Sequence, residues 1–255
     1  MNPLFFAAPT ILTGAAALTA YAAVHARSQL FGPTLCQTDT PRKLALTFDD
    51  GPNPAITPQL LDLLARHNAK ATFFVVGKFV RECPGLAKEI AARGHVLGNH
   101  TDTHPNLFCC GPEDTQRELL RCSEAILQAA WSAPQWFRPP FGYRSPWLSE
   151  IVHRQRMRTV LWTLLPGDWR RKPVEWLISR LQPIAQNAQT NLSTNKSGPR
   201  PPGGDILCLH DGNFREQNAD RARTLAALGY WLPRWHDFGL EFVTMNQAFG
   251  KVVEA

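Results

Sequence analysis

Acidic, basic and imidazole side chains stand where several predicted strands of this sequence end. They are Asp49 and Asp50, His100 and His104, Arg138, Asp168, and His210. Carboxylates and imidazoles are the usual proton-transfer groups and metal ligands of enzymes. In a β/α barrel the carboxyl ends of the strands open on one face, so residues about 160 positions apart can meet there. The pattern therefore favours one composite site.

Each of these residues taken alone has an ordinary structural explanation. A strand-terminal Asp often caps a turn. His100 and His104 are four residues apart, which puts them on one face of a helix or within reach of one ion in a loop. Such His pairs are more often structural than metal-binding. The structural explanation weakens when two His, two Asp, an Arg and a third His all follow predicted strands.

Alternating strand and helix patterns supply the frame for these residues. Alternating or β-branched runs predict strands, and apolar residues at helical spacing predict helices between them. The predicted strands are 43–48, 71–76, 95–98, 136–138, 158–162, 206–209 and 240–243, and the predicted helices are 57–67, 86–92, 113–130, 145–154, 173–185 and 221–235. This alternation predicts a parallel β/α architecture.

The first 26 residues differ in character from the rest. Residues 4–24 carry no charge, and that length can span a bilayer. No basic residue precedes the apolar run, so we favour a retained membrane anchor over a cleaved signal peptide; a buried helix of the main domain is the third alternative. We expect a linker at 27–42, a main domain at 43–250 and a polar, proline-rich loop insertion near 187–205.

Charge and cysteine content narrow the functional classes. The net charge is +6, but Lys and Arg are scattered and no nucleic-acid-binding motif is present, so we expect no nucleic-acid partner. The six cysteines contain no C-x-x-C pair. A disulfide from Cys109 or Cys110 to Cys122 is the predicted bridge, and thiols buried in the core are the alternative.

Five motifs in order make the sequence resemble the polysaccharide deacetylase family. They are T-F-D-D-G-P (47–52), H-T-D-T-H (100–104), R-P-P-F-G (138–142), D-W (168–169) and L-x-L-H (207–210). The resemblance covers about residues 43–246. It implies a distorted (β/α) barrel in a single catalytic domain. It also implies metal-dependent removal of acetyl groups from N-acetylated sugars of a peptidoglycan-like or chitin-like glycan.

The resemblance also implies a role for each motif residue. By this resemblance, the metal ligands are Asp50, His100 and His104, the general base is Asp49, and the Arg that orients the base is Arg138. The oxyanion donor is the backbone N–H of Phe141, and the general acid is His210. The substrate pocket is formed by Trp169, Leu207, Leu209 and Asp168. Two imidazoles and one carboxylate suit Zn²⁺, with Co²⁺ or Fe²⁺ as alternatives. The guanidinium fork of Arg138 can hold a carboxylate by two hydrogen bonds.

One position departs from the family pattern. Many members have an Asp three residues before the Asp of the D-W motif, where it pairs with the acid His; this chain has Leu165 there. Asp168, Asp211 or a water could hold His210 instead. An easier leaving group would suit a weaker acid, so an O-acetyl esterase is the first alternative function.

Two other functions remain open from the sequence. A membrane-tethered glycan-binding protein with a degenerate site is one, although the retained base, ligands and Arg argue against it. A glycosidase with paired carboxylates is the other, and it would leave the His pair unexplained. We expect a cell-envelope location, with the catalytic domain periplasmic or extracellular; secretion after signal cleavage is the alternative. An anchor would place the domain there if its amino terminus lay inside the cell. Arg27, just after the apolar run, mildly disfavours this orientation, because basic residues tend to stay on the cytoplasmic side.

Overall fold

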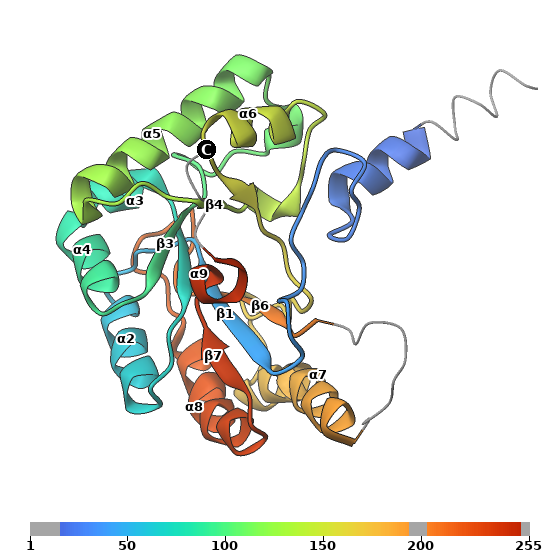
Figure 1. The fold of residues 1–255 in the computed structure, drawn as a ribbon. Coiled ribbons are helices and arrows are strands. Elements are labelled where there is room, and N and C mark those ends of the chain that lie inside the picture. Colours follow the sequence, from blue (N-terminus) through green and yellow to red (C-terminus); the bar gives the residue numbers. More distant parts are fainter. Residues whose placement is uncertain (1–15, 194–202, 251–255) are drawn as a thin grey trace, which may run out of the picture.

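A parallel sheet forms the centre of the molecule (Figure 1). The computed structural model describes residues 16–193 and 203–250. The strands in this part of the chain are β1 (Lys43–Asp49), β2 (Thr72–Val75), β3 (Val96–Asn99), β4 (Trp136–Phe137), β5 (Arg158–Thr159), β6 (Ile206–His210) and β7 (Glu241–Val243). They pair in the order β5-β4-β3-β2-β1-β6, with β7 also on β1, and every pairing is parallel.

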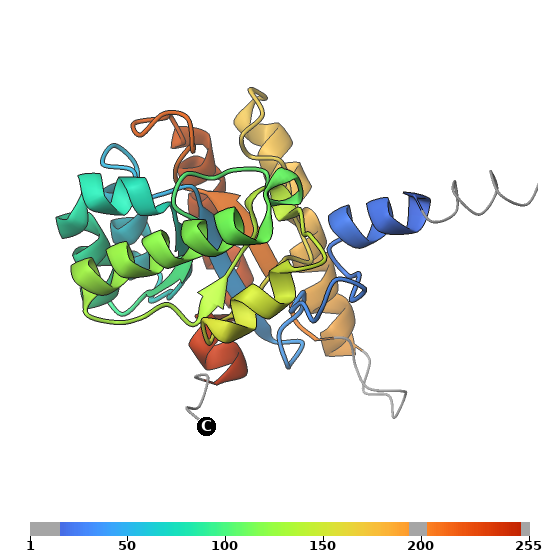
Figure 2. The same ribbon diagram turned by 90° about the horizontal axis from the view of Figure 1, so that it is seen from above.

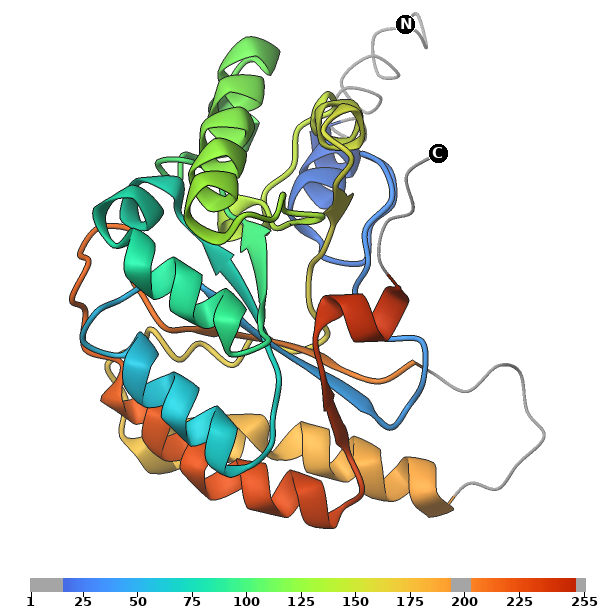
Figure 3. The same cartoon turned by 60° about the vertical axis from the view of Figure 1, so that its left-hand side comes forward.

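Helices cover the outside of this sheet. They are α2 (Thr57–Arg66), α3 (Gly77–Glu82), α4 (Pro84–Ala92), α5 (Pro112–Ala130), α6 (Leu148–Arg154), α7 (Val174–Ser193), α8 (Ala222–Asp237) and α9 (Met245–Phe249), with short 3₁₀ turns at Leu107–Cys109 and Pro140–Gly142. Figure 3 shows α2, α8 and α7 along one flank, and α3, α4 and α5 on another. The predicted β/α alternation is confirmed.

Local sequence explains where two of these helices begin. Proline fits the first helical turn because its missing N–H needs no partner there, and acidic side chains favour the amino end of the helix dipole. In α5, Pro112 opens the helix and Glu113 and Asp114 occupy its first turn. In α9, the side chains of Thr244 and Gln247 form a reciprocal capping box.

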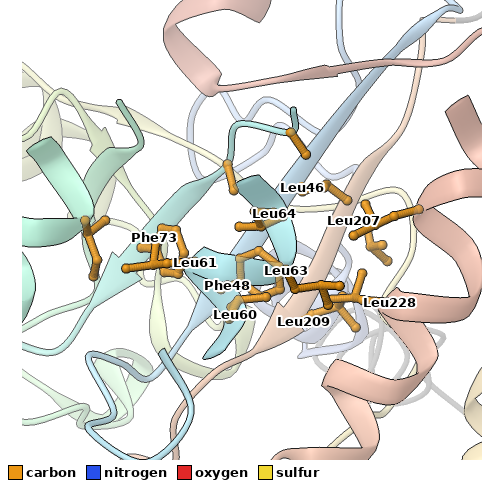
Figure 4. Packing of buried hydrophobic residues seen from close by; sticks show 14 of the residues in the cluster. Leu46, Phe48, Leu60, Leu61, Leu63, Leu64, Phe73, Leu207, Leu209 and Leu228 are labelled. Atoms are coloured by element: carbon orange, nitrogen blue, oxygen red, sulfur yellow. The ribbon is translucent and has the colours of Figure 1, made fainter. Parts of the chain in front are cut away.

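Side-chain alternation along the strands separates the core from the interior of the barrel. Successive residues of a strand point to opposite faces. Leu46 and Phe48 of β1 pack outward against the helices, as Leu207 and Leu209 of β6 do (Figure 4), and Leu44 belongs to the same buried cluster. The residues between them on β1 therefore face the barrel interior.

The barrel is closed irregularly. After β5 the chain continues to β6, where the N–H of Thr163 donates to Ile206 O (3.0 Å) and the N–H of Cys208 donates to Leu164 O (3.0 Å). At the amino end of the strands, Met245 and Ala248 of α9 join a buried cluster with Trp136 and fill the interior. The predicted distorted barrel is thus confirmed, and its open end lies at the carboxyl ends of the strands.

Three elements differ from the sequence prediction. The short helices α3 and α9 were not predicted, because five or six residues carry too little periodicity. Helix α7 extends past residue 185 to Ser193 and contains Pro183. Its buried face continues from Leu181 to Ala188, and this outweighs the polar residues that predicted a loop. The expected insertion at 187–205 is therefore helical at first, and its residues 194–202 lie outside the described part of the chain.

The segment before the barrel is tied to it. Residues 16–24 are helical and project from the body of the molecule (Figures 1 and 2). The guanidinium of buried Arg144 donates to the carbonyls of Ser28 and His25, both at 2.6 Å. Leu35 forms a bridge with Val160, so the expected linker at 27–42 runs against the barrel. Within 16–193 and 203–250 every helix is too short or too polar to cross a membrane; residues 4–15 of the predicted span lie outside these ranges.

All six cysteines are free. The predicted bridge to Cys122 is wrong, because that residue lies on the buried face of α5, with its Sγ 3.3 Å from the carbonyl oxygen of Val75. Cys109 is exposed ahead of the helix. The alternative for Cys122, a small residue of the core, is confirmed.

Candidate active site

A cavity of about 490 Å³ opens at the carboxyl ends of the strands. It receives side chains from β1, from the loops after β3, β4 and β5, and from β6. Its lining comprises Asp49, Asp50, His100, His104, Pro139, Phe141, Gly142, Tyr143, Trp162, Leu165, Trp169, Cys208, His210, Asn213, Phe214, Arg215 and Arg221. Most residues that the motifs single out are therefore brought to one place.

Asp49 is the last residue of β1 and is buried at the base of the cavity. Its Oδ1 accepts a hydrogen bond from Arg138 Nη1 (2.7 Å), and its Oδ2 lies 3.3 Å from Cys208 Sγ. Burial alone would raise the pKa of Asp49, but the Arg138 guanidinium, with the nearby imidazoles, holds it below its usual value. The carboxylate is therefore ionised at neutral pH and available to accept a proton.

Arg138 follows β4 and is fully buried. Its Nη1 also donates to Thr47 Oγ1 (2.7 Å), its Nη2 to Leu161 O (3.0 Å), and its Nε to Val160 O (3.3 Å). The sequence led us to expect two hydrogen bonds from Arg138 to a carboxylate, but Asp49 receives only one. The Nε and Nη2 donors of Arg138 bind backbone carbonyls instead. Arg138 is thus fixed by the barrel wall and holds Asp49 by one charged hydrogen bond.

Asp50, His100 and His104 form a compact group beside Asp49. Their potential ligand atoms all lie within 4.8 Å of one another. Nε2 of His104 and Nε2 of His100 are 3.2 and 3.6 Å from Asp50 Oδ1. That oxygen is buried and has no hydrogen-bond partner, which is costly for a carboxylate unless a cation is bound. The two imidazoles, the carboxylate and the unsatisfied Oδ1 of Asp50 fit a divalent metal ion.

Both imidazoles are prepared for coordination. His100 Nδ1 lies 2.7 Å from Arg138 O, which directs Nε2 toward Asp50, an arrangement usual for metal-bound His. Burial, with a smaller effect of His100, lowers the pKa of His104 to about 2, so this ring is neutral. Only the neutral form of an imidazole binds a metal.

Glu118 and Arg81 hold the loop that carries the two His, and sequence reasoning missed both. Glu118 on α5 accepts hydrogen bonds from the N–H groups of Asp102 (3.0 Å) and Thr103 (2.8 Å). Arg81 on α3 forms a 2.7 Å ion pair with Asp102. Nothing in their local sequence signals this role, because the contacts depend on how α3 and α5 pack.

His210 is held by Asp168. Its Nδ1 lies 2.8 Å from Asp168 Oδ1, and its backbone N–H donates to Asp168 Oδ2 (2.8 Å). Burial alone would lower the pKa of His210, but the Asp168 carboxylate raises it to about 9. Leu165 at the departing position therefore does not deprive His210 of a carboxylate. Asp168 itself is buried behind His210 and is not among the cavity residues, contrary to its expected place in the pocket.

Asp211 is not the carboxylate that pairs with His210. Thr57 donates to its Oδ2, and Asn53 Nδ2 donates to its backbone oxygen (2.9 Å). Burial raises the pKa of Asp211 to about 7. The residue secures the start of α2 and the turn after β6, on the side of the strand opposite to the cavity lining.

Leu207 and Leu209 also lie away from the cavity. Both are fully buried in the main core (Figure 4), and neither is among the lining residues. Strand alternation is the reason, since His210 faces the cavity and its neighbour Leu209 must face the helices. Cys208 takes the inward position instead.

Aromatic rings form the wall of the cavity. Phe141 and Trp169 are 47% and 42% exposed, so their faces are open to a ligand. The His104 ring stacks on Phe214 at 4.1 Å, and the Trp169 ring meets His210 edge-on at 5.1 Å. Phe214 was missed from the sequence, although it follows His210 by only four residues. Exposed aromatic faces of this kind suit a sugar ring.

Comparisons with known proteins agree with this geometry. The family model described as polysaccharide deacetylase matches residues 37–160. A chitooligosaccharide deacetylase of Sinorhizobium fredii is 36% identical over 208 residues, 79% of this chain and 89% of that protein. A peptidoglycan-N-acetylglucosamine deacetylase of Bacillus cereus is 34% identical, over 80% of this chain and 86% of its own. The solved structure of the Bc1960 peptidoglycan N-acetylglucosamine deacetylase superposes with a TM-score of 0.71 at 27% identity, covering 86% of this chain and 92% of that one.

Proposed function

This chain belongs to the polysaccharide deacetylase family, and we propose that it hydrolyses the N-acetyl group of a peptidoglycan-like or chitin-like glycan to release acetate. One observation carries the proposal. A buried, ionised carboxylate, an unsatisfied Asp–His–His group and a carboxylate-paired His face one cavity. Amide hydrolysis needs a base for water, a centre that polarises the carbonyl, and an acid for the departing nitrogen.

Asp50, His100 and His104 are the residues that would hold the metal ion. We propose Zn²⁺, with Co²⁺ or Fe²⁺ as alternatives, because two imidazoles and a carboxylate suit these ions. When bound, such an ion supplies Lewis-acid chemistry, polarising the acetyl carbonyl and lowering the pKa of water toward about 7.

Asp49 takes the proton from the attacking water. Its Oδ1 is bound by Arg138, so Oδ2, which accepts only a weak hydrogen bond from the Cys208 thiol (3.3 Å), is the oxygen that takes the proton. The guanidinium keeps the pKa of Asp49 low, which ensures ionisation before the reaction. Because Arg138 is fixed by three other hydrogen bonds, the carboxylate is held in one orientation.

His210 protonates the nitrogen as the C–N bond breaks. An amine leaves poorly unless it gains a proton, so the acid must be charged at working pH. Asp168 on Nδ1 keeps the ring protonated and turns Nε2 away from itself. Trp169 packs on the same imidazole and limits its rotation.

Phe141 contributes a backbone N–H for the oxyanion and an aromatic ring that bounds the cavity. Its backbone N–H is the proposed donor to the oxyanion that forms on the acetyl oxygen. Its φ of 58° places it in the left-handed region, a strained conformation that the turn after β4 imposes beside the cavity. Its ring, with Trp169 and Leu165, bounds the space proposed for the acetyl methyl and the sugar.

The alternatives lose support from the same geometry. The argument for an O-acetyl ester depended on a poorly held acid, whereas Asp168 is 2.8 Å from His210. A degenerate binding module would not need an ionised Asp49 next to a complete donor set for a metal. We further propose that the catalytic domain acts in the cell envelope, outside the cytoplasm, where peptidoglycan and chitin-like polymers occur.

Acetate release tests this function. The purified chain is incubated with N-acetylglucosamine oligomers and with peptidoglycan, with and without chelator, and then with Zn²⁺ or Co²⁺ restored. We expect release that chelation stops and metal restores, and that Asp49→Asn lacks at every metal concentration. Release from O-acetylated but not N-acetylated glycans would refute the N-deacetylase assignment, as would full activity of Asp49→Asn.

A further inference from the structure

Asp49, Cys208 and His210 form a second group of potential metal ligands beside the first. One ligand atom from each lies within 4.8 Å of the other two. Pairing of β1 with β6 produces this proximity, because Asp49 is the register partner of His210 and Thr47 that of Cys208. Cys208 and His210 are two residues apart on one strand, so both side chains point to the same face. Both line the cavity, which gives an ion a path to them.

Each donor has one atom that neither Arg138 nor Asp168 engages. Arg138 binds Oδ1 of Asp49 and leaves Oδ2, which is 3.3 Å from Cys208 Sγ. Asp168 binds Nδ1 of His210 and leaves Nε2. A carboxylate on the far nitrogen is the usual support of a metal-bound His, since it fixes the tautomer and raises the basicity of the ligand.

The donor set differs from that of Asp50, His100 and His104. It combines sulfur, nitrogen and oxygen, and a thiolate favours thiophilic ions such as Zn²⁺ or Cd²⁺ over Mg²⁺ and Ca²⁺. Zinc bonds of about 2.0–2.3 Å put neighbouring tetrahedral ligands about 3.3–3.8 Å apart. The 3.3 Å between Asp49 Oδ2 and Cys208 Sγ already lies in this range, and a ligand atom of His210 lies within 4.8 Å of both.

We propose that Asp49, Cys208 and His210 form a second, inhibitory site for a thiophilic divalent ion. Binding forms bonds from the ion to Oδ2, Sγ and Nε2, and the protons of the thiol and of Nε2 leave to solvent. The inhibitory part rests on the proposed function, because the ion then occupies the atoms assigned to the base and the acid. Low metal concentrations would activate the protein through the first site, and excess would inhibit it through this one.

Cobalt spectroscopy on the full chain tests the site without reference to activity. Apoprotein titrated with Co²⁺ should develop a near-ultraviolet thiolate-to-cobalt charge-transfer band. Cys208→Ser should lose the band, whereas Cys109→Ser, which alters an exposed thiol, and His100→Ala, which alters the first group, should keep it. Equilibrium dialysis against Zn²⁺ should give two ions per wild-type chain and one per Cys208→Ser chain. Circular dichroism checks folding, and Cys208→Ala replaces the variant if Ser is not tolerated.

Inhibition is measured separately. Excess Zn²⁺ should suppress acetate release by the wild type at least tenfold and by Cys208→Ser far less. A wild type without the band, or a Cys208→Ser protein that keeps it, would overturn the second site even if acetate release is normal. A Cys208-dependent band in a chain that releases no acetate would support the site and count against the proposed function instead.

Discussion

Asp49 and Asp50 are neighbours in sequence, yet the two halves of the site around them are built differently. Asp49 ends a regular strand, and Arg138 and Cys208 contact its two carboxylate oxygens. Asp50 faces two imidazoles and keeps a buried oxygen without a hydrogen bond. The first half is complete as a protein structure. The second lacks a positive charge, so a cation is the partner that would complete it.

The backbone shows the same division. Asp49 lies within the sheet, whereas Asp50, Thr101 and His104 have φ of 71°, 65° and 63°. Non-glycine residues in this region cost about 1–3 kcal/mol each, and persist where their surroundings hold them. Glu118 and Arg81 supply that support for the His loop. The proton-transfer half is thus positioned by strands, and the metal half by strained loops braced from α3 and α5.

The largest expected effect on activity comes from a substitution in the complete half of the site, around Asp49. Asp49→Asn removes the proposed base and should lower kcat by about 10²–10⁴-fold, the range usual for loss of general base catalysis. The cavity and the first metal group should remain, because Asn is isosteric. Acetate release under saturating substrate gives the value. A loss smaller than tenfold would assign the base elsewhere.

Arg138→Met tests how far the complete half depends on its buried cation. Removing one member of a buried ion pair leaves the other uncompensated and typically costs about 3–5 kcal/mol. We expect a fall of that size in the free energy of unfolding, measured by urea denaturation. Arg154→Met, at an exposed ion pair with Glu150, is the control and should change stability by less than about 1 kcal/mol. Equal effects of the two variants would contradict the described role of Arg138.

In a protein whose proposed second site is removed by Cys208→Ser, added metal should stabilise the fold through the incomplete half. A ligand at 100 times its Kd adds about 2.7 kcal/mol to the stability of the form that binds it. We expect a rise in Tm of the Cys208→Ser apoprotein with Zn²⁺ or Co²⁺, and little rise when His104→Ala is added to it. Thermal unfolding at several metal concentrations measures it. A similar rise in both proteins would place the stabilising ion outside Asp50, His100 and His104.

The smallest effect concerns the pH profile. With its pKa raised to about 9, His210 is protonated below that pH and loses its proton as the pH rises through it, so activity should fall there. Asp168→Asn removes the charge that raises this pKa, and the fall should move to lower pH, toward the ordinary value of 6.5. Asp211→Asn is the control, since Asp211 bonds to Thr57 instead. An unchanged basic limb in Asp168→Asn would contradict the pairing.

Much of this arrangement was predictable from the sequence. The convergence of Asp49, Asp50, His100 and His104 follows from parallel strands whose carboxyl ends share one face. The outward direction of Leu209 could also have been predicted, since it alternates with His210 on one strand. The prediction that Leu207 and Leu209 line the cavity followed the motif and neglected this parity.

Other features depend on tertiary packing. Asp168 reaches His210 because the chain after β5 joins β6 through Thr163 and Leu164, a path that local sequence does not encode. Two of the four hydrogen bonds of Arg138 go to the carbonyls of Val160 and Leu161, and these partners become visible only when β4 and the chain after β5 are placed. The bracing by Glu118 likewise follows from how α5 crosses the His loop.

The division of work between Asp49 and Asp50 is tested most directly by metal content. The Cys208→Ser protein, which lacks the proposed second site, and its Asp49→Asn and Asp50→Asn derivatives are equilibrated with one equivalent of Zn²⁺, desalted, and analysed for zinc per chain alongside acetate release. We expect both variants to be inactive, with zinc retained by Asp49→Asn and lost from Asp50→Asn. Retention by Asp50→Asn, or equal loss from both variants, would contradict the account.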